Sequence, residues 1–221
     1  MSPRVSVLLT TYSRPRMLAE AIESVLGQTF TDYELIILDD NSPAEAAGTP
    51  ELLAAYWNDP KIRIYKDDVT PDERAARVRY AVLANIGLAL ARGEYVTYLC
   101  DDDLYLPRRL EVMTARLGQG DCQVVYGSQQ VMRDGQQVMM RPAAAVLAKA
   151  SMVVDHSSVM HTRQAAADAG GWDEDPAHWN HADAAFWDRL TAAGHLFYPV
   201  DEVTDVHRFH AGSVSEAGIP A

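Results

Sequence analysis

The sequence has few cysteines, no long apolar run and no excess of basic residues. Cys100 and Cys122 are the only cysteines among its 221 residues, too few for a disulfide scaffold and consistent with reduced thiols in the cytoplasm. No uninterrupted apolar stretch approaches the roughly 20 residues of a membrane helix. The first apolar stretch is also too short for a secretory signal. We therefore expect a cytoplasmic protein without a transmembrane segment, and peripheral contact with a membrane stays open.

The charge balance argues against another class of partner. The chain carries 31 acidic residues against 19 basic ones, a formal net charge of -12. This leaves no basic field for a phosphate backbone, so we expect no nucleic-acid partner. An anionic small ligand would need a local cluster of arginines or a metal ion. The length and the ordinary apolar share of 48% indicate one globular domain.

Apolar and amphipathic segments alternate along the first half of the chain. Strands are predicted at residues 5–9, 33–38, 61–66 and 94–100. Helices are predicted at residues 14–28, at 73–93 with Gly93 as the C-cap, and from near Pro107. Strands that alternate with crossover helices predict a parallel sheet with right-handed connections.

Polar side chains follow three of these predicted strands. They are Thr10 and Tyr12, then Asp39 and Asp40, then Asp101, Asp102 and Asp103. In open α/β sheets, ligands bind beyond the carboxyl ends of the strands. The three clusters are far apart in sequence, and we expect them to converge at one edge of the sheet.

The acidic triplet Asp101–Asp103 favours a metal site. Two carboxylates about 4 Å apart repel by about 4 kcal/mol at an effective dielectric constant of 20. A divalent cation reverses that repulsion, and oxygen ligands suit Mg²⁺ or Mn²⁺. The alternative is a solvated loop that begins a helix. The position of the triplet after an apolar strand favours the metal.

Several other polar and aromatic residues have two interpretations each. Asp39 and Asp40 could accept hydrogen bonds from a ribose or a base, although an Asx-type turn explains the pair more simply. Tyr12 could stack on a base or cover the core. One or two of the arginines Arg74, Arg77 and Arg79 could reach a ligand, since their spacing keeps all three from sharing one helix face. Trp172 and Trp179 could pack on a sugar or anchor the core and a lid.

The second half of the chain has a different pattern. Residues 122–142 predict two strands around an Asp134-Gly135 hairpin turn. Residues 183–194 predict a helix that places Phe186 and Trp187 on its apolar face, and residues 195–210 predict a late strand and loop. No linker divides the chain, so we expect a single domain.

These motifs together resemble a known family. The segments "VSVLLTTYSRPRMLAEAIESVLGQTFTDYELIILDDNSP" and "GEYVTYLCDDD" resemble the nucleotide-binding half of family 2 inverting glycosyltransferases with the GT-A fold. The motifs "DHSSVMH", "GGWDEDPAHW" and "HADAAFWDRL" are similar to a spore-coat polysaccharide enzyme of that family. The likeness covers roughly residues 3 to 205.

The resemblance implies an α/β fold of the GT-A type. Its Rossmann-like, mostly parallel central sheet would be flanked by helices, with a smaller mixed region on the acceptor side. Within the single domain, the nucleotide-binding half would comprise about residues 1–103 and the acceptor-binding half about residues 104–221.

The resemblance also implies an activity. This would be metal-dependent, inverting transfer of a sugar from a UDP- or TDP-sugar to a hydroxyl acceptor, expected to be a carbohydrate, in polysaccharide or glycoconjugate synthesis. Two alternatives remain: a catalytically inactive nucleotide-sugar-binding module, and a sugar-phosphate nucleotidyltransferase. The second would be expected to carry a glycine-rich loop after its first strand, and "TTYSRPR" contains no glycine.

Individual roles follow from the resemblance, position by position. Thr10 and Tyr12 would hold the uracil or thymine, Asp40 with Asp39 would bind the base and ribose, and Arg74 would contact the base. Asp101 and Asp102 would hold Mn²⁺ or Mg²⁺ with Asp103 beside them, and Asp102 is the better candidate for the direct ligand. Asp183 would be the general base. Cys100 departs from the family, because it occupies the place of the first acid in the metal motif.

Overall fold

A nine-stranded sheet forms the centre of the computed structural model, which describes residues 2–43 and 48–210. Its strands are β1 (Val5–Thr11), β2 (Tyr33–Asp39), β3 (Ile62–Lys66), β4 (Tyr95–Cys100), β5 (Leu104–Tyr105), β6 (Val124–Arg133), β7 (Gln136–Arg141), β8 (Val159–Thr162) and β9 (Phe197–Phe209). The strand order is β3-β2-β1-β4-β8-β6-β9-β5, and β7 pairs with β6.

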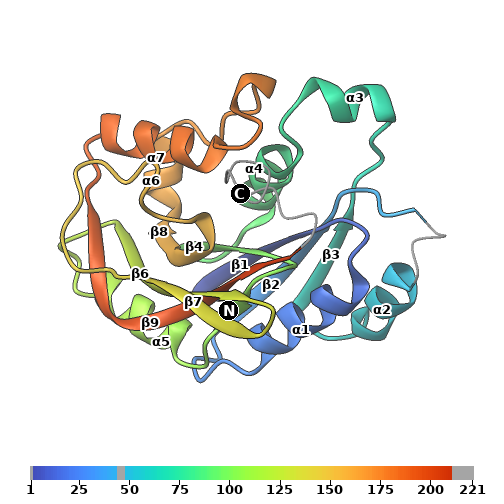
Figure 1. Cartoon of the computed structure of the whole chain (residues 1–221), viewed down its shortest axis with the longest axis horizontal. Coiled ribbons are helices and arrows are strands. Elements are labelled where there is room, and N and C mark those ends of the chain that lie inside the picture. The colour runs from blue at the N-terminus through green and yellow to red at the C-terminus, as the bar shows by residue number, and fades with distance from the viewer. Residues whose placement is uncertain (1, 44–47, 211–221) are drawn as a thin grey trace.

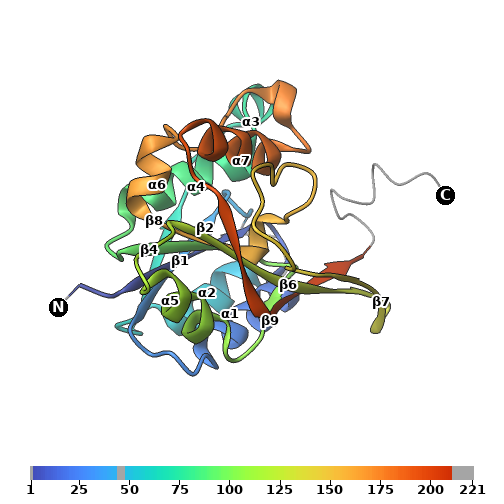
Figure 2. The same cartoon turned by 90° about the vertical axis from the view of Figure 1, so that its left-hand side faces the viewer.

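Helices cover both faces of this sheet (Figures 1 and 2). They are α1 (Pro15–Leu26), α2 (Thr49–Tyr56), α3 (Pro71–Ala76), α4 (Arg79–Leu90), α5 (Arg109–Leu117), α6 (Arg163–Asp168) and α7 (Ala182–Ala192), with 3-10 turns η1 (His156–Ser158) and η2 (Pro176–His178). One face carries α1, α2 and α5, and the other carries α4, α6 and α7. Within the described ranges, no helix has both the length and the apolar character needed to cross a membrane.

Strand directions confirm the expected combination of a parallel sheet and a smaller mixed region. β3, β2, β1 and β4 are parallel neighbours. Beyond β4, the strand β8 is antiparallel to both β4 and β6, whereas β9 is parallel to β6. β1 lies between β2 and β4, so the chain moves outward from it in both directions. The carboxyl end of β1 is therefore where a ligand crevice is expected.

Alternate residues of the central strands supply two separate cores. On β1, Val7 and Leu9 pack toward α1 and α5, whereas Leu8 packs in the core beneath α4 and α7. Every residue of β2 is buried. Because the strand is covered on both faces, residues 35–38 form a continuous apolar run, and the buried Glu34 is paired with Arg92.

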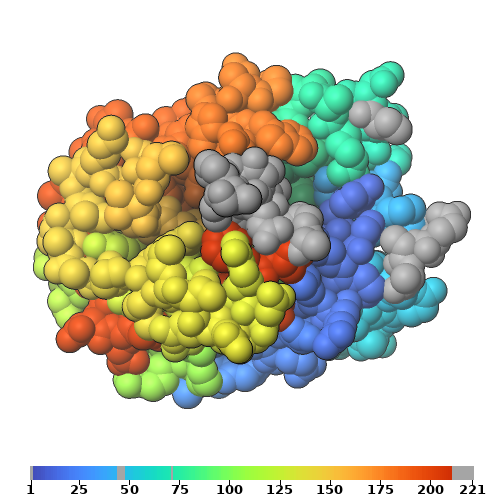
Figure 3. All heavy atoms as spheres, in the orientation of Figure 1, coloured from blue at the N-terminus to red at the C-terminus, as the bar shows by residue number. Residues whose placement is uncertain are grey.

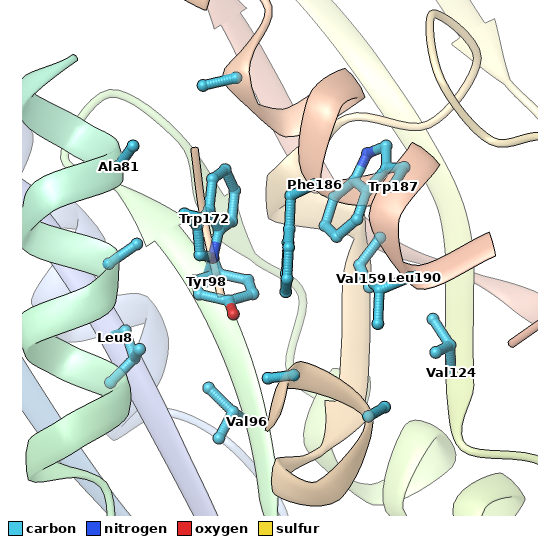
Figure 4. Packing of buried hydrophobic residues seen from close by; sticks show 14 of the residues in the cluster. Leu8, Ala81, Val96, Tyr98, Val124, Val159, Trp172, Phe186, Trp187 and Leu190 are labelled. Carbon is cyan, nitrogen blue, oxygen red and sulfur yellow. The ribbon is translucent and has the colours of Figure 1, made fainter. Parts of the chain in front are cut away.

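Aromatic side chains fill the core beneath α4 and α7 (Figure 4). Trp172 stacks on Phe186 with ring centroids 4.8 Å apart, and Tyr98 meets Trp172 edge-on at 5.0 Å. Trp187 lies against Phe186 and donates its indole N–H to the Val154 carbonyl oxygen at 2.9 Å. Trp172 is therefore an anchor of the core and not a surface that packs on a sugar.

The single helix predicted over residues 73–93 is wrong, because the chain forms α3 and α4 with a break between them. Arg77 has φ -144° and ψ 156°, an extended conformation, and Val78 is also extended. The Val78 N–H donates to the Glu174 carbonyl oxygen at 3.0 Å instead of to a helix carbonyl. This tertiary hydrogen bond competes with the helical pattern and turns Arg74 and Arg79 toward the same carboxylate.

Gly93 is also not the helix C-cap, since α4 ends at Leu90 and Ala91 follows as its cap. Gly93 instead lies against the start of β1, where an added Cβ would come 2.6 Å from the Ser6 nitrogen. The glycine is needed for close backbone approach rather than for helix termination.

The hairpin predicted at Asp134-Gly135 is confirmed. Asp134 and Gly135 have φ of 51° and 76°, and they join β6 to β7. Two consecutive left-handed residues match the right-handed twist of the flanking strands. The hairpin extends away from the body of the molecule (Figure 2).

Candidate active site

A cavity of about 460 Å³ lies at the carboxyl ends of β1 and β4. Its walls include nearly all of the residues that the sequence singled out. These are Thr10, Tyr12, Asp40, Arg74, Asp101, Asp102, Asp103 and Asp183. The three polar clusters expected to converge do so here, and Asp183 joins them from the second half of the chain.

A second hollow, of about 850 Å³, lies at the other end of β4 beside Glu94 and Tyr95. It is the larger of the two, but none of the predicted site residues lines it. The smaller cavity is therefore the candidate active site.

Asp40 is held by two arginines at one end of the smaller cavity. Arg79 Nε donates to Asp40 Oδ1 at 2.8 Å, and Arg74 forms an ion pair with the other carboxylate oxygen. The Arg74 guanidinium also lies 4.3 Å from the centre of the Tyr12 ring, a cation–π contact. Tyr12 is half-exposed rather than covering the core. Two of the three clustered arginines thus reach the site, whereas Arg77 pairs with Glu174 at the surface.

Asp39 adopts the alternative turn role that the sequence left open. Its carboxylate accepts from the Ser42 backbone N–H at 3.0 Å and from the Ser42 hydroxyl at 2.6 Å. Asp39 is buried and is not among the residues that line the cavity. It shapes the loop after β2, and Asp40 alone of the pair faces the cavity.

The acids of the triplet divide into two groups, since Asp101 and Asp102 share Arg14 whereas Asp103 does not. Asp101 accepts from the Thr11 hydroxyl at 2.7 Å, from the Tyr12 N–H at 3.2 Å and from Arg14 at 2.7 Å. Burial raises the pKa of Asp101 to about 6, although the arginine opposes this shift. Asp101 therefore anchors the loop that follows β1.

Asp102 is half-buried and faces two cationic or polar groups. Its Oδ2 lies 2.7 Å from Arg14 Nη1 and 3.1 Å from His210 Nε2. Arg14 thus bridges two neighbouring carboxylates, which reduces the repulsion between Asp101 and Asp102 without a metal ion.

Asp103 is fully buried and belongs to a different group. It accepts from the Ser157 hydroxyl at 2.8 Å and lies 3.1 Å from His207 Nδ1. Burial alone would lower the pKa of His207, but Asp103 and Asp155 raise it to about 9. His207 is therefore protonated at neutral pH, and its single positive charge offsets part of the charge of the two carboxylates.

The residues present fit a divalent cation. Ligand atoms of Asp103, Asp155 and His207 all lie within 4.8 Å of one another, an oxygen-rich set completed by one imidazole. A cation at this group would have to displace the proton of His207. Asp102 and His210 offer a second carboxylate and imidazole on the more accessible side of the triplet.

Asp183 lies in the first turn of α7 and lines the cavity. Its Oδ1 accepts from the Ala184 N–H at 2.8 Å, so the helix-start role that the sequence also allowed is present. Burial raises the pKa of Asp183, and nearby His156 opposes this shift. A carboxylate with a raised pKa is a better proton acceptor at neutral pH than an ordinary aspartate.

Sequence reasoning missed several side chains of the cavity wall. Arg14, Asp155, His156 and His207 all face it. His156 Nε2 lies 3.1 Å from the Cys100 sulfur, so the residue that replaces the family's first acid has a polar partner. The motif "DVHRFH" alone gave no signal for His207 and His210, because only the pairing of β9 with β5 and β6 brings them to the triplet.

Comparison with known proteins identifies the class. Residues 6–169 match the family described as Glycosyl transferase family 2. The chain belongs to this family.

Two relatives and one solved structure illustrate the similarity. Protein CgeD of Bacillus subtilis (strain 168) is 40% identical over 216 residues, which cover 93% of this chain and 50% of that protein. The putative colanic acid biosynthesis glycosyl transferase WcaA of Escherichia coli (strain K12) is 35% identical over 121 residues, covering 53% of this chain and 39% of WcaA. The crystal structure of S. aureus TarS 1-349 in complex with UDP-GlcNAc aligns with a TM-score of 0.76 at 14% identity, covering 99% of this chain and 62% of that one.

The structural likeness at this identity supports the fold, which is the expected α/β fold of the GT-A type. The matched region spans about half the length of CgeD and 39% of the length of WcaA. The activity, donor and acceptor of the chain are therefore matters for the proposal that follows.

Proposed function

We propose that the chain is a metal-dependent inverting glycosyltransferase domain. It moves a sugar from a UDP- or TDP-sugar to a hydroxyl acceptor in polysaccharide or glycoconjugate synthesis. The observation that carries this proposal is the convergence of Tyr12, Asp40, Arg74, the acidic triplet and Asp183 on one cavity. Family membership and the UDP-GlcNAc complex of TarS support a nucleotide-sugar donor.

The two ends of the cavity suit the two ends of the donor. Tyr12 and Arg74 present an aromatic face and a guanidinium to the base, and Asp40 fixes that guanidinium. The diphosphate would lie near Asp102, where Mn²⁺ or Mg²⁺ would stabilise the negative charge that develops on the leaving group. Asp102 is the proposed direct ligand, with His210 beside it, and the Asp103, Asp155 and His207 group is the alternative.

Asp183 would act on the acceptor. The acceptor hydroxyl oxygen would bond to the anomeric carbon from the face opposite the diphosphate, while the bond from that carbon to the diphosphate oxygen breaks and the nucleoside diphosphate leaves. The hydroxyl proton would pass to the Asp183 carboxylate. Attack from the opposite face inverts the configuration at the anomeric carbon. The raised pKa of Asp183 and its place on the cavity wall support this role. An inactive binding module would not need such a carboxylate, and the loop after β1 lacks the glycines expected of a nucleotidyltransferase.

Thermal unfolding with UDP or TDP, each with and without Mn²⁺, tests the donor site. A ligand that binds only the native state at about 100 times its dissociation constant adds roughly 2.7 kcal/mol of stability. We expect a stabilising shift that requires Mn²⁺ in the wild type and in the surface control Asp188→Ala, and its loss in Asp102→Ala. If no nucleotide shifts the wild-type transition with or without the metal, the transferase proposal fails.

Turnover tests the role of Asp183. We expect Asp183→Asn to keep the metal-dependent nucleotide shift while sugar transfer and donor hydrolysis from UDP-GlcNAc fall by about 100-fold or more, since a general base contributes about 10²–10⁴. Asp188→Asn, an exposed change on the same helix, should leave both rates unchanged. Equal rates in Asp183→Asn and the wild type would remove Asp183 from the mechanism.

A further inference from the structure

Trp179 is a large aromatic side chain that lines the cavity but is not packed into the core. It is 55% exposed, whereas Trp172 and Trp187 are at most 3% exposed. Trp179 makes no aromatic stacking contact with any other residue in the described ranges, whereas the two core tryptophans share several. An indole left half in water on a cavity wall is a surface available to a ligand.

The segment around Trp179 is braced by its own side chains. Asp173 accepts from Arg189 Nη2 at 2.6 Å and lies 3.6 Å from His178 Nε2. His178 Nδ1 lies 3.3 Å from His181 Nε2, which ties together the residues on both sides of Trp179. A ring carried on a braced segment loses less freedom on binding than one on a loose loop.

Trp179 is placed on the acceptor side of the cavity. It stands four residues before Asp183, and Trp179, Asn180 and Asp183 all line the cavity. The base end is built instead from the loops after β1 and β2 and from α3. In Figure 3 the orange segment before α7 lies at the surface next to the teal α3 region. Trp179 and Asn180 of this segment line the cavity.

The chemistry of the indole face indicates a sugar ring. One face of a pyranose presents a row of C–H groups, which are slightly positive and match the negative π-face of an aromatic ring. The hydroxyl groups around that ring remain free to reach the general base. A phospholipid chain or a peptide serine offers no such flat apolar face.

We propose that Trp179 is the platform on which the acceptor pyranose stacks, so that its nucleophilic hydroxyl faces Asp183. The acceptor is then a carbohydrate rather than a lipid or peptide hydroxyl. This inference rests on the proposed glycosyl transfer, and it adds a specificity-determining residue that acts on the acceptor and not on the donor.

Saturation-transfer NMR with methyl β-glucopyranoside, methyl β-galactopyranoside and methyl N-acetyl-β-glucosaminide tests the platform without any donor. The proteins are the wild type, Trp179→Ala, Trp179→Phe and the control Trp57→Ala. Trp57 is the C-cap of α2, is 71% exposed and does not line the cavity. We expect saturation of at least one pyranoside by the wild type and the control, its loss in Trp179→Ala and partial recovery in Trp179→Phe. Equal saturation in the wild type and Trp179→Ala, or none by the wild type, would overturn the proposal.

Kinetics with the same pyranosides and UDP-GlcNAc then separates the two substrates. We expect the acceptor KM to rise roughly tenfold or more in Trp179→Ala, because the variant lacks the ring on which the acceptor stacks. A tenfold change corresponds to about 1.4 kcal/mol of binding free energy. The donor KM and the Mn²⁺-dependent UDP shift should not change. A weaker UDP shift in Trp179→Ala would contradict an acceptor role, whereas a wild type that binds a pyranoside but no nucleotide would refute glycosyl transfer and leave the sugar platform standing.

Discussion

His161 shows how a buried residue of the core can control stability as a function of pH. It is fully buried, and its Nδ1–H donates to the Thr162 carbonyl oxygen at 2.8 Å. Its Nε2 therefore accepts from the Tyr98 hydroxyl, also at 2.8 Å. Burial lowers the pKa of His161 to about 4, and the charge of nearby His195 contributes to the shift. The neutral imidazole is thus built into the native state.

The sign of the pH effect follows from that lowered pKa. Near pH 6.5 the unfolded chain takes up a proton that the native state refuses until about pH 4, so protonation favours unfolding in this window. We expect the stability from His161 to be complete above about pH 6.5 and to fall by about 3 kcal/mol toward pH 4. Urea unfolding at both pH values checks this, with His161→Gln showing a smaller loss than the wild type. The same loss in both proteins would assign it to other groups.

At the scale of elements, hydrogen bonds from Arg109 link the start of α5 to three strands. Its guanidinium donates to Thr97 on β4 at 2.8 Å, to the Val159 carbonyl oxygen on β8 at 3.2 Å and to Asp205 on β9 at 3.0 Å. Both Arg109 and Asp205 have fully buried side chains. The ion pair is therefore surrounded by protein and shielded from water.

Arg109→Met should lower the free energy of unfolding by about 3–5 kcal/mol, because it leaves the Asp205 carboxylate buried without its partner. The neighbouring Arg108 is the matched control, since it is exposed and pairs with Glu111 and Glu202 at the surface. Arg108→Met should cost about 1 kcal/mol or less. Urea denaturation of both variants measures the difference, and equal losses would contradict the structural role of Arg109.

At the scale of the whole molecule, the sequence predicted the elements that local patterns determine. The apolar runs of β1, β2 and β4 and the Asp134-Gly135 turn were readable because burial on two faces and positive φ each select particular residues. The break between α3 and α4 was not readable, because it depends on the tertiary hydrogen bond from Val78 to Glu174.

The candidate site divides in the same way. Asp40, the acidic triplet and Asp183 could be located from sequence, since they follow apolar strands or match the family motifs. His207 and His210 could not, because the pairing of β9 with strands far away in sequence brings them to the triplet, and His156 reaches Cys100 only through the tertiary fold. The sheet runs through both predicted halves, with β8, β6 and β9 joined to β4. We accordingly propose that the nucleotide-binding and acceptor-binding halves form one domain.

The pairing of β9 restricts which insertions and deletions this strand can accept. Asp205, the partner of Arg109, and His207, the partner of Asp103, are two residues apart and lie on the same face of that strand. One inserted or deleted residue between them would turn His207 away from the triplet, or turn Asp205 away from its arginine. The distance in sequence between Asp205 and His207 is therefore fixed by the two-residue period of the strand, because only an even spacing keeps both side chains on the same face of β9.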